Sequence, residues 1–516
     1  MISKMSNTKL MVLNLSFVMI LKLVTFVFGM ISSRIMLLVY GSELNGLVAS
    51  INQFINYINL VELGLTSCSV YALYKPIADN NVEAINGVMS ATKNYYFQAG
   101  YIFSSLVLVL SCVYPLFSDV SSLNYWEVAY LVIVLSSAGV INFFISAKYR
   151  VFLIANQRQY VISALSILAV ILNTALIYIF GYVMNVHITV LKTICILTSL
   201  TPAIIIILYT KIAFKGIHFR NVKPDMDALK DRYTVFVNEI AGNIHFGSPI
   251  IILTFIVALT DVSVYSVYNT ISNGVGGILN SIIVPIAASF GVLLAGESIE
   301  SFKKVYFEFE APYYTLSNMV FAITLMVFMP FIEVYTQGVT DANYIRYVFM
   351  VLMIVNLIVS NLYNPQAILV RAIGNFKEVQ PQTIIQASIT IVLGIPLTIM
   401  WGICGVVIAS IVANLYRSIA MIILFGNKIE GVKRKDTIKN IILSLVNFGA
   451  IILICYILNN KILTLFGGRI SGYASWVGFS MIISIIAICI TYSFMWIFQR
   501  EQLKALTARL MSKIKI

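Results

Sequence analysis

Residues 95–117, YYFQAGYIFSSLVLVLSCVYPLF, and residues 313–332, YYTLSNMVFAITLMVFMPFI, begin with the same pair of tyrosines, 218 residues apart. Both segments are about as long and apolar as a membrane-crossing helix, which needs roughly 20 apolar residues. The helix-connecting residues 155–158, ANQR, recur 219 residues later as 374–377, GNFK. The chain therefore contains two halves that share one register.

The composition indicates that most of the surface faces lipid. Hydrophobic residues make up 60% of the 516 residues and charged residues only 11%, and the mean hydropathy is +0.93. A soluble domain carries roughly 25% charged residues. Fourteen membrane spans are predicted, at 10–33, 44–74, 95–117, 128–147, 160–183, 187–213, 233–259, 262–295, 311–332, 344–370, 381–401, 403–426, 440–458 and 473–498.

These spans predict an all-α polytopic membrane protein of about 14 transmembrane helices. Six spans fall in each repeat, so both halves enter the membrane from the same side. Such halves are related by a pseudo-two-fold axis along the membrane normal, with a transport site between them near the midplane. The predicted parts are an N-terminal six-helix lobe (1–213), an interfacial connector (214–232), a C-terminal six-helix lobe (233–426), a loop (427–439), an extra helix pair (440–498) and an amphipathic tail (499–516).

The net charge of +13 indicates orientation rather than nucleic-acid binding. Of the 34 basic residues, 27 lie in the segments that would share one side of the membrane, including 211–232, 428–439 and the tail after 499. The positive-inside rule then places both termini in the cytoplasm. We expect a multi-pass protein of the bacterial inner membrane, with the connector, the loop and the tail on its cytoplasmic side.

The chain offers little for metal or enzyme chemistry. Its six cysteines lie singly in apolar stretches without the spacing of metal ligands, and it has three histidines. We therefore expect no metal and no cofactor. The predicted outer loops are short, which disfavours a membrane-embedded glycosyltransferase, and the protein is predicted not to be an enzyme.

Polar residues inside the spans gather on helical faces. A spacing of three and four residues places each set on one side of its helix. The second span carries Asn52, Asn56 and Asn59, the seventh Asn243 and His245, and the eighth Asn269 and Asn273. Four such helices (spans one, two, seven and eight) would enclose a hydrated cavity. The alternative is interhelical hydrogen bonding, which is the commoner role of an isolated asparagine in a membrane and the commoner role of His245.

Five ionisable residues in or beside the spans are stronger candidates for a functional role than the amides. Lys22, Glu62, Glu239 and Arg417 lie well inside spans, and Arg34 lies at an outer helix end. A charge at the bilayer centre costs roughly 2.5–3.5 kcal/mol on insertion scales, so these groups are expected to face water or one another. Lys22, Arg34 and Arg417 form the predicted cationic site. Glu62 and Glu239 are the candidates for ion coupling.

Three motifs near the N-terminus resemble those of a known family. They are Arg34 followed by GSELNGL at 41–47, LVELGL at 60–65, and VYALYKP at 70–76. They are similar to the bacterial polysaccharide repeat-unit flippases of O-antigen and capsule biosynthesis, which belong to the multidrug/oligosaccharidyl-lipid/polysaccharide exporter superfamily. The resemblance implies an alternating-access transporter that moves undecaprenyl-diphosphate-linked oligosaccharide from the cytoplasmic to the outer leaflet.

The resemblance also implies partners and leaves alternatives open. Membrane lipids, and beyond them the polysaccharide polymerase and the chain-length regulator, are the expected partners of a chain expected to act as a monomer. Lipid II-type flippases and drug/cation antiporters of the same superfamily are alternatives, and a membrane glycosyltransferase is a remote one. The cations would neutralise the diphosphate, and the amides suit sugar hydroxyls. The extra helix pair would either flank a groove for the lipid tail or pack against the second lobe.

Energy coupling is predicted from the repeat offset. Subtracting 219 from Glu239 gives position 20, within one turn of Lys22, so the two residues are expected at similar depth on opposite lobes. The membrane potential favours outward movement of a diphosphate. Return of the empty carrier would then use H⁺ or Na⁺ bound at Glu239 or Glu62.

Overall fold

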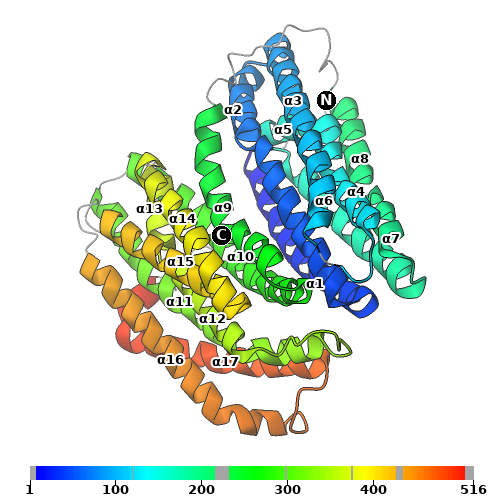
Figure 1. The fold of residues 1–516 in the computed structure, drawn as a ribbon. Helices are drawn as coiled ribbons and strands as arrows, with labels where there is room; N and C mark the ends of the chain where they lie inside the picture. Colours follow the sequence, from blue (N-terminus) through cyan, green and yellow to red (C-terminus); the bar gives the residue numbers. More distant parts are fainter. Residues whose placement is uncertain are drawn as a thin grey trace. The chain divides into compact units, whose positions relative to one another are not determined.

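The computed structural model describes residues 7–118, 120–214, 232–296, 299–373, 376–425 and 434–505, and all structural statements below concern these residues. Most of the predicted connector, much of the loop at 427–439 and the end of the tail lie outside them. The described chain is almost entirely helical (Figure 1). It forms two compact units, Met1–Ser266 and Val267–Ile516.

The first unit contains nine α-helices and the start of a tenth. They are α1 (Asn7–Ile58), α2 (Leu65–Ala78), α3 (Val82–Val113), α4 (Tyr125–Ile141), α5 (Ala147–Ala155), α6 (Gln159–Leu176), α7 (Ile188–Ile194), α8 (Leu197–Ala213), α9 (Arg232–Ile256) and α10 (Leu259–Gly296). Gly41 has a φ of 78° and a ψ of 175°, a non-helical conformation that divides α1 into two helical parts, one for each of the first two predicted spans. A second break follows, where a 3-10 turn (Asn59–Glu62) leads to Gly64 with a φ of 81°.

The second unit contains the remaining helices. They are α11 (Ile299–Tyr335), α12 (Tyr347–Asn361), α13 (Asn364–Ile373), α14 (Phe376–Trp401), α15 (Ile403–Phe425), α16 (Arg434–Thr464) and α17 (Tyr473–Phe498). Eleven described helical stretches are long and apolar enough to cross a membrane. One of them, Lys9–Ala78, covers two predicted spans, and α9 and α10 correspond to two more. The all-α, multi-pass architecture is therefore confirmed, with a helix at each of the fourteen predicted positions.

The repeat is visible in the order and the breaks of the helices. In the first unit, α4 is followed by a π-helical segment (Asn142–Ser146) before α5. In the second, α12 ends at Asn361 and α13 begins after a two-residue turn. Asn142 and Asn361 are 219 residues apart, which is the register of the sequence repeat. A helix is thus interrupted next to an asparagine at the same place in both halves.

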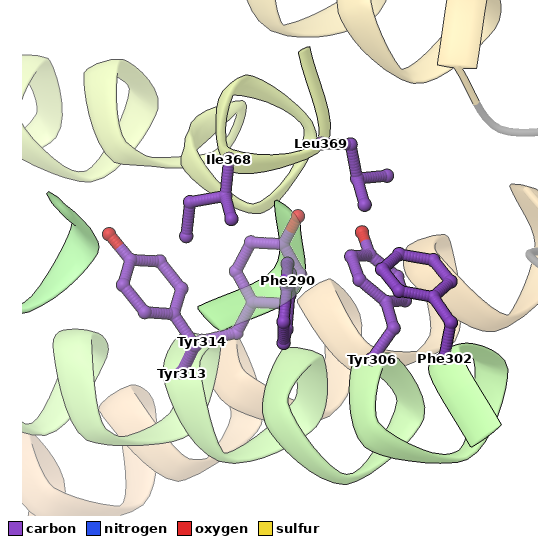
Figure 2. Close-up of a cluster of buried hydrophobic side chains, with 7 residues drawn as sticks. All are labelled: Phe290, Phe302, Tyr306, Tyr313, Tyr314, Ile368 and Leu369. Atoms are coloured by element: carbon purple, nitrogen blue, oxygen red, sulfur yellow. The ribbon is translucent and has the colours of Figure 1, made fainter. Parts of the chain in front are cut away.

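The repeated tyrosines point into the interior of their own halves. Tyr96 is 1% exposed and Tyr314 is 2% exposed. Around Tyr314, aromatic rings from α10 and α11 pack against Ile368 and Leu369 of α13 (Figure 2). This cluster fills the space between the long helix α11 and the short helix α13.

The extra helix pair packs against α11. Both α16 and α17 run alongside this helix (Figure 1). An apolar cluster built around Ala322, Ile451 and Phe479 joins the three helices, and Trp476 of α17 donates a hydrogen bond to the carbonyl of Val327 at 3.0 Å. The pair therefore packs against the second half, and its role in binding the lipid tail stays a prediction.

Polar contacts at one end of α11 strengthen this attachment. Glu310 is 3% exposed, and its carboxylate accepts hydrogen bonds from Thr437 at 2.7 Å and Asn440 at 3.1 Å, both on α16. Tyr306 of α11 and Gln366 of α13 donate to the same carboxylate, at 3.1 and 3.5 Å. One buried charge therefore connects three helices.

We expect Glu310→Ala to destabilise the protein by on the order of 3 kcal/mol, because buried donors on three helices would lose their acceptor. Glu310→Gln, which keeps one acceptor oxygen, should lose less. Thermal unfolding of the purified variants in detergent measures both effects. Glu333→Ala, at an exposed position of the same helix, is the control. An unfolding temperature of Glu310→Ala equal to that of the control would show that the carboxylate does not hold α16 in place.

Candidate functional site

The part of α1 that follows Gly41 has two polar faces with different surroundings. On one face, Ser50 lies 2.7 Å from Thr254 of α9, and Tyr57 donates to the carbonyl of Ile244 at 2.9 Å. On the other face, Asn52 and Asn56 are exposed. The contacts of Ser50 and Tyr57 define the α1–α9 seam, and the exposed amides of Asn52 and Asn56 lie on the face of α1 that is turned away from it.

Other predicted lining residues lie on α9, α10 and the 3-10 turn. Asn243 of α9 is exposed and directly precedes Ile244, whose carbonyl accepts the hydrogen bond from Tyr57. Asn59 and Asn269 are half-buried, and Asn273 is exposed. His245 is 4% exposed and its ring contacts Phe246, which matches a structural histidine.

The seam continues to the start of α10, where α1 and α10 come very close together. Asn45 donates to Ser263 at 2.7 Å, between side chains that are both buried. A Cβ atom on Gly46 would lie only 1.9 Å from the carbonyl oxygen of Leu259. Only glycine allows this approach, so polar groups of the second and eighth spans meet directly here. By the predicted orientation, this is the outer end of the spans.

Lys22 lies on the first half of α1 and is exposed. The side chains of Met19, Ile20 and Leu23 around it are 56%, 46% and 56% exposed. This stretch of α1 therefore offers an ammonium group within an apolar surface. Arg34 lies nearer Gly41 and is half-buried. Glu239 lies on α9, and its side chain is outside the described residues.

The carboxylate of Glu62 faces the interior of the first half rather than the exposed amides. It accepts hydrogen bonds from Asn142 at 2.9 Å, from Thr66 at 3.2 Å and from Tyr96 at 3.3 Å. Thr66 and Tyr96 are also hydrogen-bonded to each other at 2.7 Å. Three neutral donors from different helical segments thus surround this charge, in the way a buried anion needs.

Arg417 is buried within the second unit. It is 8% exposed, donates to Thr383 of α14, and lies with its guanidinium carbon 5.6 Å from the centre of the Tyr363 ring. Its Nε atom has no hydrogen-bond partner among the described residues. The predicted role of Arg417 in substrate binding stays a prediction, and in this structure its contacts are with neutral side chains of its own half.

Sequence reasoning missed Glu310, Asn142 and Arg150. Asn142 could have been found from the repeat, because Asn361 occupies its position in the second half. The guanidinium of Arg150 donates to the side-chain oxygen of Asn142 at 3.1 Å, a contact that no sequence motif indicates. Glu310 lies one residue before a predicted span, and no residue near it in sequence indicates that α16 covers it.

No protein-family model matches this chain, and no curated protein matches it in sequence. Solved structures of transporters share its fold. The lipid II flippase MurJ, in an inward closed conformation, has a TM-score of 0.69 at 16% identity and covers 94% of this chain and 99% of its own. An inward-facing multidrug resistance MATE family transporter of the MOP superfamily has a TM-score of 0.62 at 14% identity. The match covers 83% of this chain and 95% of the transporter. A MOP superfamily transporter from Pyrococcus furiosus, described as having a binding pocket of reversed polarity, has a TM-score of 0.58 at 15% identity. The match covers 82% of this chain and 96% of the transporter.

We expect cysteine at Asn52 or Asn56 to react with a membrane-impermeant thiol reagent once the six native cysteines are replaced. Exposed side chains at these positions contact either water or lipid, and the reagent reaches them only if they line a water-filled cavity. Ser50→Cys, at a position that is 0% exposed on the same helix, should stay unlabelled. Labelling is measured by mass shift in intact membranes. Equal protection of Asn52→Cys, Asn56→Cys and Ser50→Cys would indicate that this face of α1 contacts lipid.

Proposed function

We propose that this chain is a flippase that moves undecaprenyl-diphosphate-linked oligosaccharide repeat units from the cytoplasmic to the outer leaflet of the bacterial inner membrane by alternating access. The observation that carries the proposal is the extent of the shared fold. The lipid II flippase covers 94% of this chain, whereas the MATE transporters cover 83–87%. Helices α16 and α17 with their connection make up about an eighth of the chain, which is close to this difference.

The surroundings of Lys22 support a substrate that is both charged and apolar. A lysine facing only lipid would cost roughly 2.5–3.5 kcal/mol, so its exposed ammonium needs water or an anion. The exposed apolar side chains beside it suit a lipid tail. A diphosphate joined to a polyprenol presents these two properties next to each other, as an inorganic anion does not.

The exposed asparagines support a glycan on the same substrate. An amide side chain offers two N–H donors and a carbonyl acceptor, which match sugar hydroxyls that both donate and accept. Asn52 and Asn56 of α1 and Asn243 of α9 are all exposed in the first unit. Arg34 and Arg417 remain proposed cationic contacts of the diphosphate, and Asn59, Asn269 and Asn273 remain proposed contacts of the sugar.

The seam between α1 and the α9–α10 segment supports alternating access. In the predicted orientation, the contacts of Asn45 with Ser263 and of Gly46 with Leu259 close the outer end. Outward opening then requires these contacts to break. The hydrogen bonds are few and involve neutral groups, worth about 0.6 kcal/mol each in a membrane, so substrate or ion binding can reverse the closure.

Coupling to H⁺ or Na⁺ is part of the proposal, with the membrane potential favouring export of the diphosphate. Glu62 is a suitable ion-responsive group because Asn142, Thr66 and Tyr96 hold its charge. Glu239 is the second candidate. The polymerase and the chain-length regulator are proposed partners of the monomer.

A flip assay without any sugar donor tests the function. We expect purified protein in liposomes to make undecaprenyl-diphosphate-linked oligosaccharide in the inner leaflet accessible to an externally added glycosidase. Lys22→Ala should lower the rate at least tenfold, because a charge-assisted contact is worth about 1.5–3 kcal/mol. Lys435→Ala, at an exposed position of α16, should flip at the rate of the unaltered chain.

The same liposomes distinguish the alternatives. Lipid II transported in preference to the oligosaccharide lipid would assign the chain to lipid II export. Ion-driven uptake of a cationic dye, with no movement of either lipid, would indicate a drug/cation antiporter. Equal flipping by Lys22→Ala and the unaltered chain would rule out Lys22 as the diphosphate contact.

Gly46→Ala tests the closure at the predicted outer end. The added methyl group would displace α1 from α10, and overpacking of this kind costs about 1–3 kcal/mol. We expect a lower unfolding temperature and slower flipping. Gly29→Ala is the matched control, because a Cβ on this glycine of α1 meets no atom within 4 Å. If the two variants behave alike, the close approach at Gly46 is not needed.

A further inference from the structure

A cavity of 240 Å³ lies inside the first unit, among α4, the π-helical segment, α6 and α8. This volume is several times the ~30 Å³ that one water molecule occupies in the liquid. Its polar wall consists of Asn142, Ser146, Arg150, Ser166, Thr198 and Ser199. Arg150 is the one ionisable residue in this wall.

The guanidinium of Arg150 is held in place by a chain of hydrogen bonds. Its Nη1 atom donates to Oδ1 of Asn142 at 3.1 Å, and Nδ2 of Asn142 donates to Glu62 at 2.9 Å. Ser146 also donates to Oδ1 of Asn142, at 3.3 Å. One amide thus bridges the carboxylate and the guanidinium, and the carboxylate itself stays outside the wall of the cavity.

The backbone around Asn142 is adapted to this arrangement. The N–H of Ala147 donates to the carbonyl of Asn142, five residues back, which defines the π-helical turn. Such single turns re-aim side chains and occur frequently at functional sites. Here the turn places Asn142, Ser146 and Arg150 along the same wall.

Arg150 keeps most of its donors for a ligand. A guanidinium has five N–H groups, and the bond to Asn142 uses one of them. The residue is also exposed, so its remaining donors can be reached. Lys93 and Lys148 of the same unit do not line the cavity, and each lies within 5.5 Å of the centre of the Phe97 ring.

The second half provides an internal comparison. In the register of the repeat, Arg150 corresponds to Leu369, which is 0% exposed and packs against aromatic rings (Figure 2). In the second half, the position that corresponds to Arg150 therefore lies in a packed apolar core. The first half retains an arginine and a polar cavity, although an apolar side chain is compatible with the fold.

We propose that this cavity is a binding site for a phosphate or diphosphate group, with Arg150 as its charged contact and Asn142 as the residue that positions it. A planar guanidinium with free N–H groups binds phosphate oxygens in pairs. The group can come from free pyrophosphate or from the headgroup of an anionic lipid. The site lies within one unit, its wall contains none of the exposed amides Asn52, Asn56 and Asn243, and it does not depend on the proposed transport function.

Binding measurements test the site without any transport assay. We expect inorganic pyrophosphate to raise the unfolding temperature of the purified protein in neutral detergent. Arg150→Ala should weaken this binding about ten- to a hundredfold, as expected for loss of a charge-assisted hydrogen bond, and Arg150→Lys should weaken it less. Arg158→Ala is the matched control, because Arg158 of the same unit is engaged by Tyr209 and Phe214 and does not line the cavity.

A second variant guards against a folding defect. Ser199→Leu should fill the cavity and abolish the pyrophosphate effect while leaving Arg150 and Asn142 in place. Nanodiscs of phosphatidylglycerol, compared with phosphatidylcholine, identify the source of the phosphate. Stabilisation by phosphatidylglycerol that requires Arg150 would assign the site to a lipid headgroup. Pyrophosphate and phosphatidylglycerol effects that persist unchanged in both Arg150→Ala and Ser199→Leu would overturn the proposal, as would the absence of any effect in the unaltered chain.

Discussion

The constraint on which the structure depends is that charges inside a membrane protein must be satisfied by the protein itself. Glu62, Glu310 and Arg417 all lie within helical bundles, and none forms an ion pair among the described residues. Hydroxyl and amide groups satisfy them instead. Neutral partners leave the net charge of each group in place, so each remains sensitive to an ion, a proton or an anionic ligand that comes near.

The two halves use the same helical plan for different purposes. Each has an interrupted helix beside an asparagine, and each buries one of the repeated tyrosines. In the first half, the asparagine connects Glu62 to Arg150 and borders a cavity. In the second half, Asn361 accepts a hydrogen bond from Asn364 at 2.8 Å, and aromatic rings fill the neighbouring space. The second half also binds α16 through the hydrogen bonds of Glu310.

The sequence was sufficient to predict the helical spans and the repeat, because both depend on local apolar runs and a constant offset. It was not sufficient to predict how the helices are broken. The first two predicted spans are separated at Gly41 by a single non-helical residue rather than by a loop, and the π-helical turn at Asn142 depends on a hydrogen-bond register that composition does not encode. Glu62 was recognised as unusual for a membrane span. Its partners were not, because Tyr96 and Asn142 lie 34 and 80 residues away and meet it only in the folded chain.

The predicted cations differ in their surroundings, and this bears on what each can contact. Lys22 is exposed within an apolar surface, whereas Arg417 is enclosed by Thr383 and Tyr363. A buried guanidinium can reach a substrate only if α14 and α15 separate locally, while an exposed ammonium needs no such change. The first half, with Lys22, the exposed asparagines and Arg150, therefore presents the more accessible contacts for an anionic amphiphile. The unbonded Nε atom of Arg417 then makes the second half the better candidate for a change in packing during the transport cycle.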